Sequence, residues 1–379
     1  MTNPDPSARC SVALELSQAK WLVGALLPGR AKVTLQTVRG GDAEGLMDVL
    51  RKLEARASAD VGASTAISVC FESGYDGFWL ARFLADRGID THVLDAASFL
   101  VSRRGRRAKT DRIDVEAMAF TLKAYLAGDR SVCRTVEVPS PEAEDAKRLS
   151  RERTQLTRER TRHVNRIRGL LTLHGIRDVK GLWGGAWREA LEAAQTGDGR
   201  RLGSFLRAEL SREFERLYLV LAHMKQLDAE RRTATAEADA FRDAPKVERL
   251  IQLAGVGEIG ATVLVTEVFH RRFQNRKHLA SYLGLTPSPY ASGESRREQG
   301  ISKAGNKPAR TLLVELAWCW LRYQPGSGLA EWYRRIYGPH STRARKVGIV
   351  ALARKLAIAL WRFVEQGIIP AGAVMSPQR

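Results

Sequence analysis

The sequence predicts an α/β domain built on a mixed sheet, followed by mostly helical regions. Residues 10–38 contain three short runs of β-favouring residues, and the chain then alternates between helical and strand-like patterns to about Ala127. From Val138-Pro139-Ser140-Pro141 onward the hydrophobic spacing is almost entirely helical. Because alternating strands and helices are typical of a sheet covered by helices, the first region belongs to the α/β class.

The elements of the α/β region follow in order. Three strands are expected at residues 10–16, 21–27 and 33–38, and a helix from Asp42 to about Ala57 carries its leucines on one face. The chain continues with a strand at 67–71, a helix at 78–87, a strand at 91–94, the basic loop Arg103–Arg107 and a helix from about Asp111 to Ala127. This order matches a ribonuclease-H-like sheet, although other mixed α/β folds share the pattern.

A basic helical region comes next. Residues 147–168 contain nine Lys or Arg against two Glu on a helix with a thin apolar stripe. A second helix has apolar residues in steps of four and three, a heptad seam about two heptads long. These residues are Leu210, Phe214, Leu217, Leu221 and Met224. A seam this short fits either a coiled coil between subunits or an antiparallel hairpin within one chain.

The last region is expected to contain two helices around a glycine turn, Gly255–Gly260, and then a basic connector, Arg271–Lys277. A polar loop at 288–306 separates these helices from two apolar helices, at 309–321 and 347–365. We therefore predict three domains. They are an α/β domain at 1–130, a helical basic and coiled-coil region at 131–244, and a mostly helical domain at 245–379.

The composition restricts the function. The 61 Lys and Arg exceed the 42 Asp and Glu by +19, and such self-repulsion favours a polyanionic partner, with a solvated basic surface as the alternative. The four cysteines lack a CxxC pair, which argues against structural zinc and a disulfide framework. No apolar run approaches ~20 residues and the N-terminus lacks a signal-peptide core, so we expect a cytoplasmic protein without a membrane partner.

Four acids are candidate metal ligands. Glu15 and Glu72 end the first and fourth strands, which lie side by side in a ribonuclease-H-like sheet, and Asp111 and Asp114 share one face of a helix. Clustered carboxylates suit Mg²⁺ or Mn²⁺, and two such ions support in-line phosphoryl displacement. Alternatively, Asp111 is a helix N-cap and Asp114 an ordinary first-turn acid.

Two further motifs carry possible chemistry. The glycine turn fails as a dinucleotide-binding motif because it follows a helical segment, whereas a helix-hairpin-helix turn at Gly255 and Gly257 presents N–H groups to a DNA phosphate. A polar loop places the Ser292 hydroxyl close in sequence to the guanidinium groups of Arg296 and Arg297, in the stretch Ser292-Gly293-Glu294-Ser295-Arg296-Arg297. A serine can attack a phosphodiester, and these two arginines, together with Lys303, can neutralise the negative charge that develops on the phosphate. The plain alternative for Ser292 is a polar turn.

The basic helix is the third candidate. Arg151, Arg158, Arg162 and Arg166 lie along one side of it, which predicts contact with an RNA or DNA backbone. The alternative is again a solvated basic face.

Ordered motifs in both halves of the chain resemble the DEDD transposases of the insertion-sequence-110 family, which are bridge-RNA-guided recombinases related to pilin-gene invertases. In the first half these are Val12–Ser17, Cys70–Tyr75 and Lys109–Asp114. In the second half they are Ala254–Gly257, Tyr282–Pro287, Ser292-Gly293 and Ser302-Lys303-Ala304-Gly305-Asn306.

The resemblance implies a RuvC-like first domain whose acids Glu15, Glu72, Asp111 and Asp114 form a metal site. It also implies that Ser292 attacks DNA to form a 5′-phosphoserine. Its implied partners are donor and target DNA, a noncoding bridge RNA, and further copies of the chain in a homodimer or tetramer that share active sites. One residue departs from the family pattern, because Glu15 stands where Asp is usual, which puts ligand geometry and metal preference in doubt.

Two other functions remain open at this point. A junction-resolving metal nuclease needs the four acids but no serine. A non-catalytic RNA-binding or architectural protein needs only the basic helices.

Overall fold

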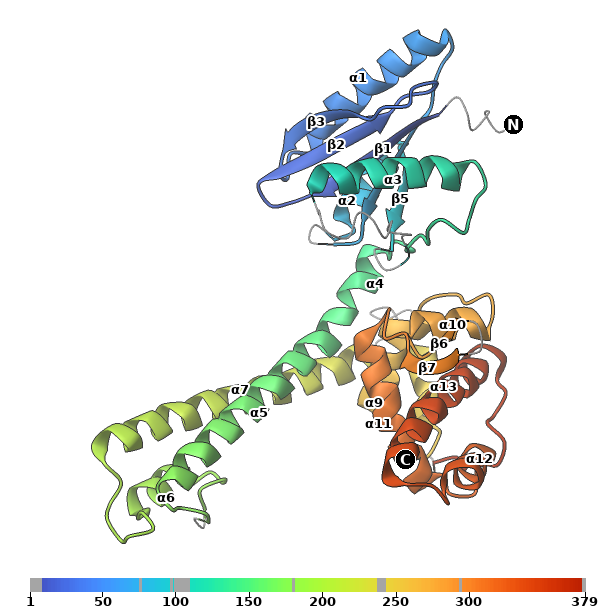
Figure 1. Cartoon of the computed structure of the whole chain (residues 1–379). Helices are drawn as coiled ribbons and strands as arrows, with labels where there is room; N and C mark the ends of the chain where they lie inside the picture. The colour runs from blue at the N-terminus through green and yellow to red at the C-terminus, as the bar shows by residue number, and fades with distance from the viewer. Residues whose placement is uncertain are drawn as a thin grey trace. The chain divides into compact units, whose positions relative to one another are not determined.

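The computed structural model describes residues 9–74, 77–95, 98, 110–178, 181–236, 243–292 and 295–376, without the side chains of 235–236 and 289–299. Within these ranges the chain forms two compact units, Met1–Ser140 and Pro141–Arg379 (Figure 1). The predicted division into three domains stays a prediction. The basic loop Arg103–Arg107 lies outside the described residues.

The first unit is built on a five-stranded sheet of order β3-β2-β1-β4-β5. Strands β1, β2 and β3 pair antiparallel, whereas β4 and β5 run parallel to β1, so the predicted mixed sheet is confirmed. The strands are β1 (Cys10–Leu16), β2 (Lys20–Leu26), β3 (Thr34–Arg39), β4 (Ile67–Glu72) and β5 (Asp90–Leu94).

Helices cover both faces of this sheet because its strands alternate apolar residues on two sides. Helices α1 (Ala43–Val61) and α2 (Trp79–Asp86) pack against one face, which includes Leu14 and Phe71. Helix α3 (Asp111–Leu126) packs against the other face, which includes the neighbouring positions Ala13 and Cys70 (Figure 1).

A glycine sets the distance between α3 and the sheet. A Cβ atom at Gly24 of β2 would lie 2.0 Å from Cγ1 of Val115, the first buried residue of α3. No side chain fits at that separation, so only glycine lets the first turns of α3 approach β2 this closely.

The second unit begins with a long antiparallel helix pair. After the short α4 (Pro141–Asp145), α5 (Lys147–Leu173) packs along α7 (Ser204–Ala236), and α6 (Trp187–Ala193) lies in the connection between them (Figure 1). The ion pairs Arg153–Asp228 and Arg166–Glu209 fix the antiparallel direction. Of the two arrangements left open for the seam, the structure forms the hairpin within one chain.

One position of the predicted seam is wrong. Leu210, Phe214, Leu217 and Met224 are buried, but Leu221 is 38% exposed and Val220 is buried in its place. The reason is that the 3.6-residue helical repeat drifts out of a strict heptad when the helices do not supercoil far.

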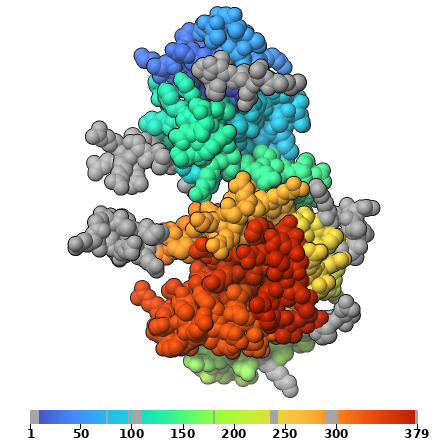
Figure 2. Space-filling view, turned by 90° about the vertical axis from the view of Figure 1, so that its right-hand side faces the viewer, coloured from blue at the N-terminus to red at the C-terminus, as the bar shows by residue number. Residues whose placement is uncertain are grey.

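The rest of the second unit is a helical body around one core. In the space-filling view its orange and red segments form one continuous mass (Figure 2). The predicted loop at 288–306 is a β-hairpin over much of its length, and a helix, α10, begins within the predicted connector. The elements are α8 (Ala244–Ile251), α9 (Glu258–Leu264), the π-helix η4 (Val265–Phe269), α10 (Arg276–Tyr282), β6 (Pro287–Ser292), β7 (Ser295–Ile301), α11 (Lys307–Tyr323), α12 (Gly328–Tyr337) and α13 (Thr342–Gln366). In the described part of the chain, no helix is both long and apolar enough to span a membrane.

Candidate functional site

The register of the central strands brings two of the predicted acids together. Leu14 of β1 pairs with Phe71 of β4 in the parallel ladder, so the next positions, Glu15 and Glu72, are neighbours. Side chains alternate along a strand, and Ala13 and Cys70 face α3. Glu15 and Glu72 therefore lie on the face that α3 covers, where both are half-buried.

The first turn of α3 carries the other two acids. Its N-cap is Thr110, whose hydroxyl accepts a hydrogen bond from the Ile113 N–H at 3.4 Å, so the interpretation of Asp111 as an N-cap is wrong. Thr110 has the extended backbone of a cap, which frees both acids for other contacts. Asp114 is half-buried beside the sheet-facing Val115, and Asp111 is exposed.

The donor chemistry of these acids fits a divalent cation. Carboxylate oxygens without His or Cys are the ligands of Mg²⁺ or Mn²⁺. Within the described ranges, however, no three His, Cys, Asp or Glu side chains lie close enough together to hold a metal ion. Two of the acids lie at the ends of neighbouring strands and two in the first turn of α3, on the helix that covers the same face of the sheet.

The predicted nucleophile ends a strand. Ser292 is the last residue of β6 and pairs with Ser295, the first of β7. The side chains of Ser292, Arg296 and Arg297, like residues 293–294, lie outside the described residues, so the structure gives the course of the backbone here and not the geometry of the hydroxyl.

Two of the motifs named above, Tyr282–Pro287 and Ser302–Asn306, hold the base of the β6–β7 hairpin together, and we call their contacts the hairpin lock. The N–H of Ser302 donates to the Thr286 carbonyl at 2.9 Å, and that of Lys303 to the Gly284 carbonyl at 3.2 Å. A Cβ at Gly284 would lie 1.8 Å from the Ala304 carbonyl oxygen, and Gly284 has a φ of +63°. The Gly284 segment and the segment after β7 thus approach more closely than any other residue allows.

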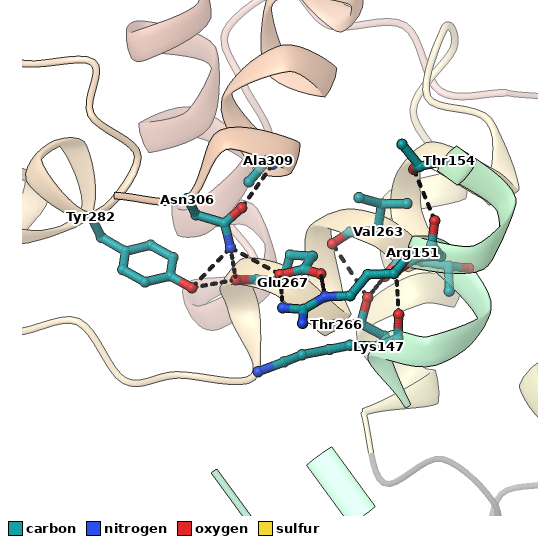
Figure 3. Close-up of polar contacts among 11 residues, drawn as sticks. Lys147, Arg151, Thr154, Val263, Thr266, Glu267, Tyr282, Asn306 and Ala309 are labelled. Atoms are coloured by element: carbon teal, nitrogen blue, oxygen red, sulfur yellow. Dashed lines mark hydrogen bonds and ion pairs between the residues drawn. The ribbon is translucent and has the colours of Figure 1, made fainter. Parts of the chain in front are cut away.

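A buried carboxylate lies beneath this lock (Figure 3). Glu267, with a side chain 2% exposed, accepts hydrogen bonds from Arg151 Nε at 2.9 Å and from Asn306 Nδ2 at 2.9 Å. Its backbone carbonyl accepts from the Tyr282 hydroxyl at 2.7 Å. Asn306 also caps α11, because its Oδ1 accepts from the Ala309 N–H at 3.0 Å. The network joins α5, η4, α10 and α11 to the foot of the hairpin.

Glu267 lies in a single π-helical turn, closed by the hydrogen bond from the His270 N–H to the Val265 carbonyl. Such turns occur often at functional sites. Burial raises the pKa of the Glu267 carboxyl, but the hydrogen bonds from Arg151 and Asn306 outweigh it, and the pKa is lowered overall. Burial also lowers the pKa of the neighbouring Lys147.

We expect Glu267→Gln to destabilise the second unit by about 1–3 kcal/mol near neutral pH, because it removes the charge of a buried carboxylate, although its partner Arg151 is 55% exposed and the pair is partly screened by solvent. The lowered pKa makes the stabilisation by Glu267 complete above about 4.5, the unfolded value, and it is lost as the pH falls through the folded pKa. The difference in the free energy of unfolding between Glu267→Gln and the wild type should therefore become smaller as the pH falls below about 4.5. Denaturant unfolding from neutral to acidic pH measures this difference. Equal stability at neutral pH would contradict the prediction.

Among the four predicted arginines of α5, the structure distinguishes two groups. Arg151 is bound to Glu267, and Arg166 forms an ion pair with Glu209 of α7. Arg158 and Arg162 are exposed, and in the described part of the chain no ion pair is recorded for either. Of the four arginines, Arg158 and Arg162 are thus the two whose guanidinium groups remain available, and their contact with a nucleic-acid backbone stays a prediction.

The glycine turn joins α8 to α9, as predicted. Gly255 has a φ of +86°, and a Cβ there would lie 3.0 Å from Cβ of Tyr323. Both facts give Gly255 a packing role; the phosphate-binding role predicted for Gly255 and Gly257 stays a prediction.

Lys303 lines a hollow of about 460 Å³ beside the hairpin, together with Arg310 and Trp318 of α11. Lys303 has a φ of +56°, a left-handed conformation unusual for lysine, which its hydrogen bond to Gly284 supports. No pattern in the sequence indicates a role for Arg310, whose guanidinium donates to the Leu283 and Ala304 carbonyls.

Comparison with known proteins agrees with these motifs. The family of DEDD transposases of IS110 matches residues 29–176, and the family described as "Transposase IS116/IS110/IS902 family" matches residues 247–331. The first match contains Glu72, Asp111 and Asp114 but begins after Glu15. The second contains Glu267, Ser292 and Asn306.

Whole relatives extend the similarity over most of the chain. The putative transposase y4rJ of Sinorhizobium fredii is 43% identical over 96% of this chain and 94% of its own length. The transposase for insertion sequence element IS1328 of Yersinia enterocolitica is 26% identical, over 79% of this chain and 84% of its own. The transposase for IS1111A of Coxiella burnetii is 28% identical, over 75% and 73%.

The two family matches, one over the mixed-sheet domain and one over the helical unit, and the whole-chain relatives together identify a DNA transposase, an enzyme that cuts and transfers DNA strands. The chain belongs to the IS110/IS116 family of insertion-sequence transposases.

Proposed function

We propose that this transposase cuts and rejoins DNA through a covalent phosphoserine at Ser292, with a divalent cation held by Glu15, Glu72, Asp111 and Asp114. The observation that carries the proposal is the hairpin lock. A two-stranded hairpin whose first strand ends in a serine is tied at its foot, through Asn306, to the buried Glu267 carboxylate, and such support is useful where a nucleophile must be held in line with a phosphate.

The proposed chemistry is a pair of exchanges at phosphorus. The Ser292 oxygen, on losing its proton, bonds to the phosphorus of the cut strand, and the bond from phosphorus to the 3′ oxygen breaks to leave a free 3′-hydroxyl. The 3′-hydroxyl of another strand then attacks the phosphoserine and releases the serine. One phosphodiester is lost and one formed, so no external energy source is needed.

The positively charged side chains of the hairpin region stabilise the negative charge on the pentacovalent phosphate as Ser292 attacks. Arg296, Arg297 and Lys303 follow Ser292 in sequence, and electrostatic stabilisation of a developing charge is a large catalytic contribution. A divalent cation held by the four acids lowers the pKa of a bound hydroxyl and neutralises phosphate charge. The proposed first domain is RuvC-like, which agrees with its mixed sheet and with acids at the ends of β1 and β4.

The proposed partners are donor and target DNA and a noncoding bridge RNA that pairs with both. The net charge of +19 supports polyanionic partners. We further propose a homodimer or tetramer in which two chains complete each active site, and a helix-hairpin-helix role for Gly255 and Gly257 toward a DNA phosphate.

One experiment tests the proposal as a whole. The purified protein, with the RNA that copurifies with it, is mixed with donor and target DNA in Mg²⁺, and the products are separated on a denaturing gel. The proposal expects joined DNA and a protein–DNA adduct, both lost after RNase treatment or in excess chelator. Cleavage without any adduct would instead favour the junction-resolving nuclease, and binding without cleavage the non-catalytic protein.

We also expect Arg158→Gln with Arg162→Gln to weaken nucleic-acid binding uniformly across sequences. The slope of log K against log salt should fall by up to ~0.9 per lost contact for duplex DNA, and by ~0.7 for single strands. Arg151 is unsuitable for this test because its loss leaves Glu267 buried without its partner. The matched control is Arg212→Gln with Lys225→Gln, which removes the same charge from exposed positions of α7. If the two double variants weakened nucleic-acid binding equally, the net charge of the protein, and not this side of α5, would account for the binding.

A further inference from the structure

The far end of the α5–α7 hairpin contains a hollow whose lining residues belong to none of the motifs named above, although the first family match extends to residue 176. Residues 174–203 connect the two helices there, and the hollow has a volume of about 410 Å³. Its walls include Arg168 of α5 and Arg177, Asp178 and Trp183 of the connection. Arg168 lies 17 residues along α5 from Arg151, or about 25 Å at 1.5 Å per residue.

A column of aromatic rings holds Trp183 at the edge of this hollow. Tyr218 stacks on Trp187 with ring centroids 6.0 Å apart, and Trp187 stacks on Phe214 at 4.9 Å. Phe214 contacts the Trp183 ring at 5.8 Å. Trp183 is nevertheless 47% exposed, although its neighbour Leu182 is buried. The core thus fixes the indole ring and leaves much of its surface to solvent.

Two arginines line the hollow with the exposed ring. The Arg168 guanidinium lies 5.4 Å from the centroid of Trp183, and Arg177 lines the same hollow. Both are exposed, and no ion pair is recorded for either among the described residues. Other arginines of this end differ, because Arg188 pairs with Glu215 and Arg207 with Glu192. Within the described ranges, then, neither arginine of the hollow is paired with a carboxylate, although the Arg168 guanidinium lies over the Trp183 ring.

We propose that this hollow binds an unpaired nucleotide of a single-stranded nucleic acid. The base stacks on Trp183, as bases of single strands stack on aromatic side chains in other proteins. Arg168 and Arg177 contact the phosphates beside it, and the Asp178 carboxylate accepts from a base amino group. A base within a duplex is stacked on both sides and does not fit. The inference uses the transposase's contact with nucleic acid and is independent of RNA guidance and of the phosphoserine.

The test uses the full-length protein and short single strands of about 12 nucleotides, matching the usual site size. RNA, DNA of the same sequence, and a duplex are titrated separately by fluorescence anisotropy. Trp183→Ala should weaken single-strand binding by about 5- to 150-fold, since one base stack contributes about 1–3 kcal/mol. Trp183→Phe should keep most of the affinity, and duplex binding should not change. If Trp183→Ala loses affinity for single-stranded RNA only, or for single-stranded DNA only, the result identifies which nucleic acid supplies the unpaired base.

Trp79→Ala is the matched control, because Trp79 is also partly exposed and lies against other aromatic rings, in the first unit. If Trp183→Ala melts the helix pair, Trp183→Phe and Arg168→Gln with Arg177→Gln carry the test, the latter pair leaving the aromatic column intact. Crosslinking of thio-substituted strands should label the peptide that contains Trp183. Unchanged single-strand affinity in the arginine pair and in Trp183→Ala, or crosslinks only elsewhere, overturns the proposal even where strand exchange proceeds normally.

Discussion

Ser292→Ala should abolish strand joining, with a loss of at least about a thousandfold, because no other group takes over as the covalent carrier. The variant should still bind RNA and DNA, and no protein–DNA adduct should form on denaturing gels. The fold should persist, since the hairpin is held at its foot by backbone hydrogen bonds of Ser302 and Lys303 and by the Glu267 network, none of which involves the Ser292 hydroxyl.

The neighbouring hydroxyls are the matched controls for this prediction. Ser295 pairs with Ser292 across the hairpin, and Ser302 lies at its base with its N–H bound to Thr286. Ser295→Ala and Ser302→Ala should keep the adduct, because each removes one hydroxyl and leaves the backbone in place. An adduct in Ser292→Ala, or one that maps by mass to Ser295 or Ser302, would assign the nucleophile elsewhere.

The sheet of the first unit could be predicted from the sequence because its elements are short, regular and apolar. Strand β1 was predicted with its observed bounds, Cys10–Leu16, since alternation of buried side chains is a local signal. The hairpin at Pro287–Ile301 was predicted as a loop, because its proline-, serine- and arginine-rich strands have low β propensity. What pairs them is the lock at Gly284 and Asn306, and contacts between such segments leave no periodic pattern.

The polar network around Glu267 could likewise not be predicted from local sequence patterns. Glu267 interrupts an apolar run, and a charged residue at such a position indicates that it has a buried partner without indicating which residue that is. Its partner, Arg151, lies 116 residues away in the chain. Arg151 shares the spacing of Arg158 and Arg162, so sequence alone assigned all of them to nucleic acid. Only the packing of α5 against η4 separates the residue that holds the protein together from those free to bind.

The pairing of Glu15 with Glu72 was the part of the site that topology could predict. Parallel neighbouring strands bring their ends to one edge, and the register makes the two acids adjacent. The position of α3 over them depends on Gly24, which allows Val115 to approach the sheet. The sequence contains that glycine without indicating which helix it accommodates.

Asp114→Asn or Asp111→Asn should abolish DNA strand cleavage, by at least about a thousandfold, while the protein stays folded. Each replacement keeps the size of the side chain and removes a charged ligand, and both residues lie in the first turn of α3 without a capping role. The matched control is Glu116→Gln, on the same helix. Its surface pair with Arg112 contributes less than about 0.5 kcal/mol, so that variant should cleave normally.

A binding measurement separates metal loss from misfolding. Titration of the protein with Mn²⁺ should give weaker binding in Asp114→Asn than in Glu116→Gln, with equal thermal stability. Glu15→Asp restores the acid usual in the family but shortens the reach from β1 by one methylene, so a change in the activity ratio between Mg²⁺ and Mn²⁺ is expected. Full cleavage by Asp114→Asn in excess chelator would show that the reaction does not depend on a divalent cation at these acids.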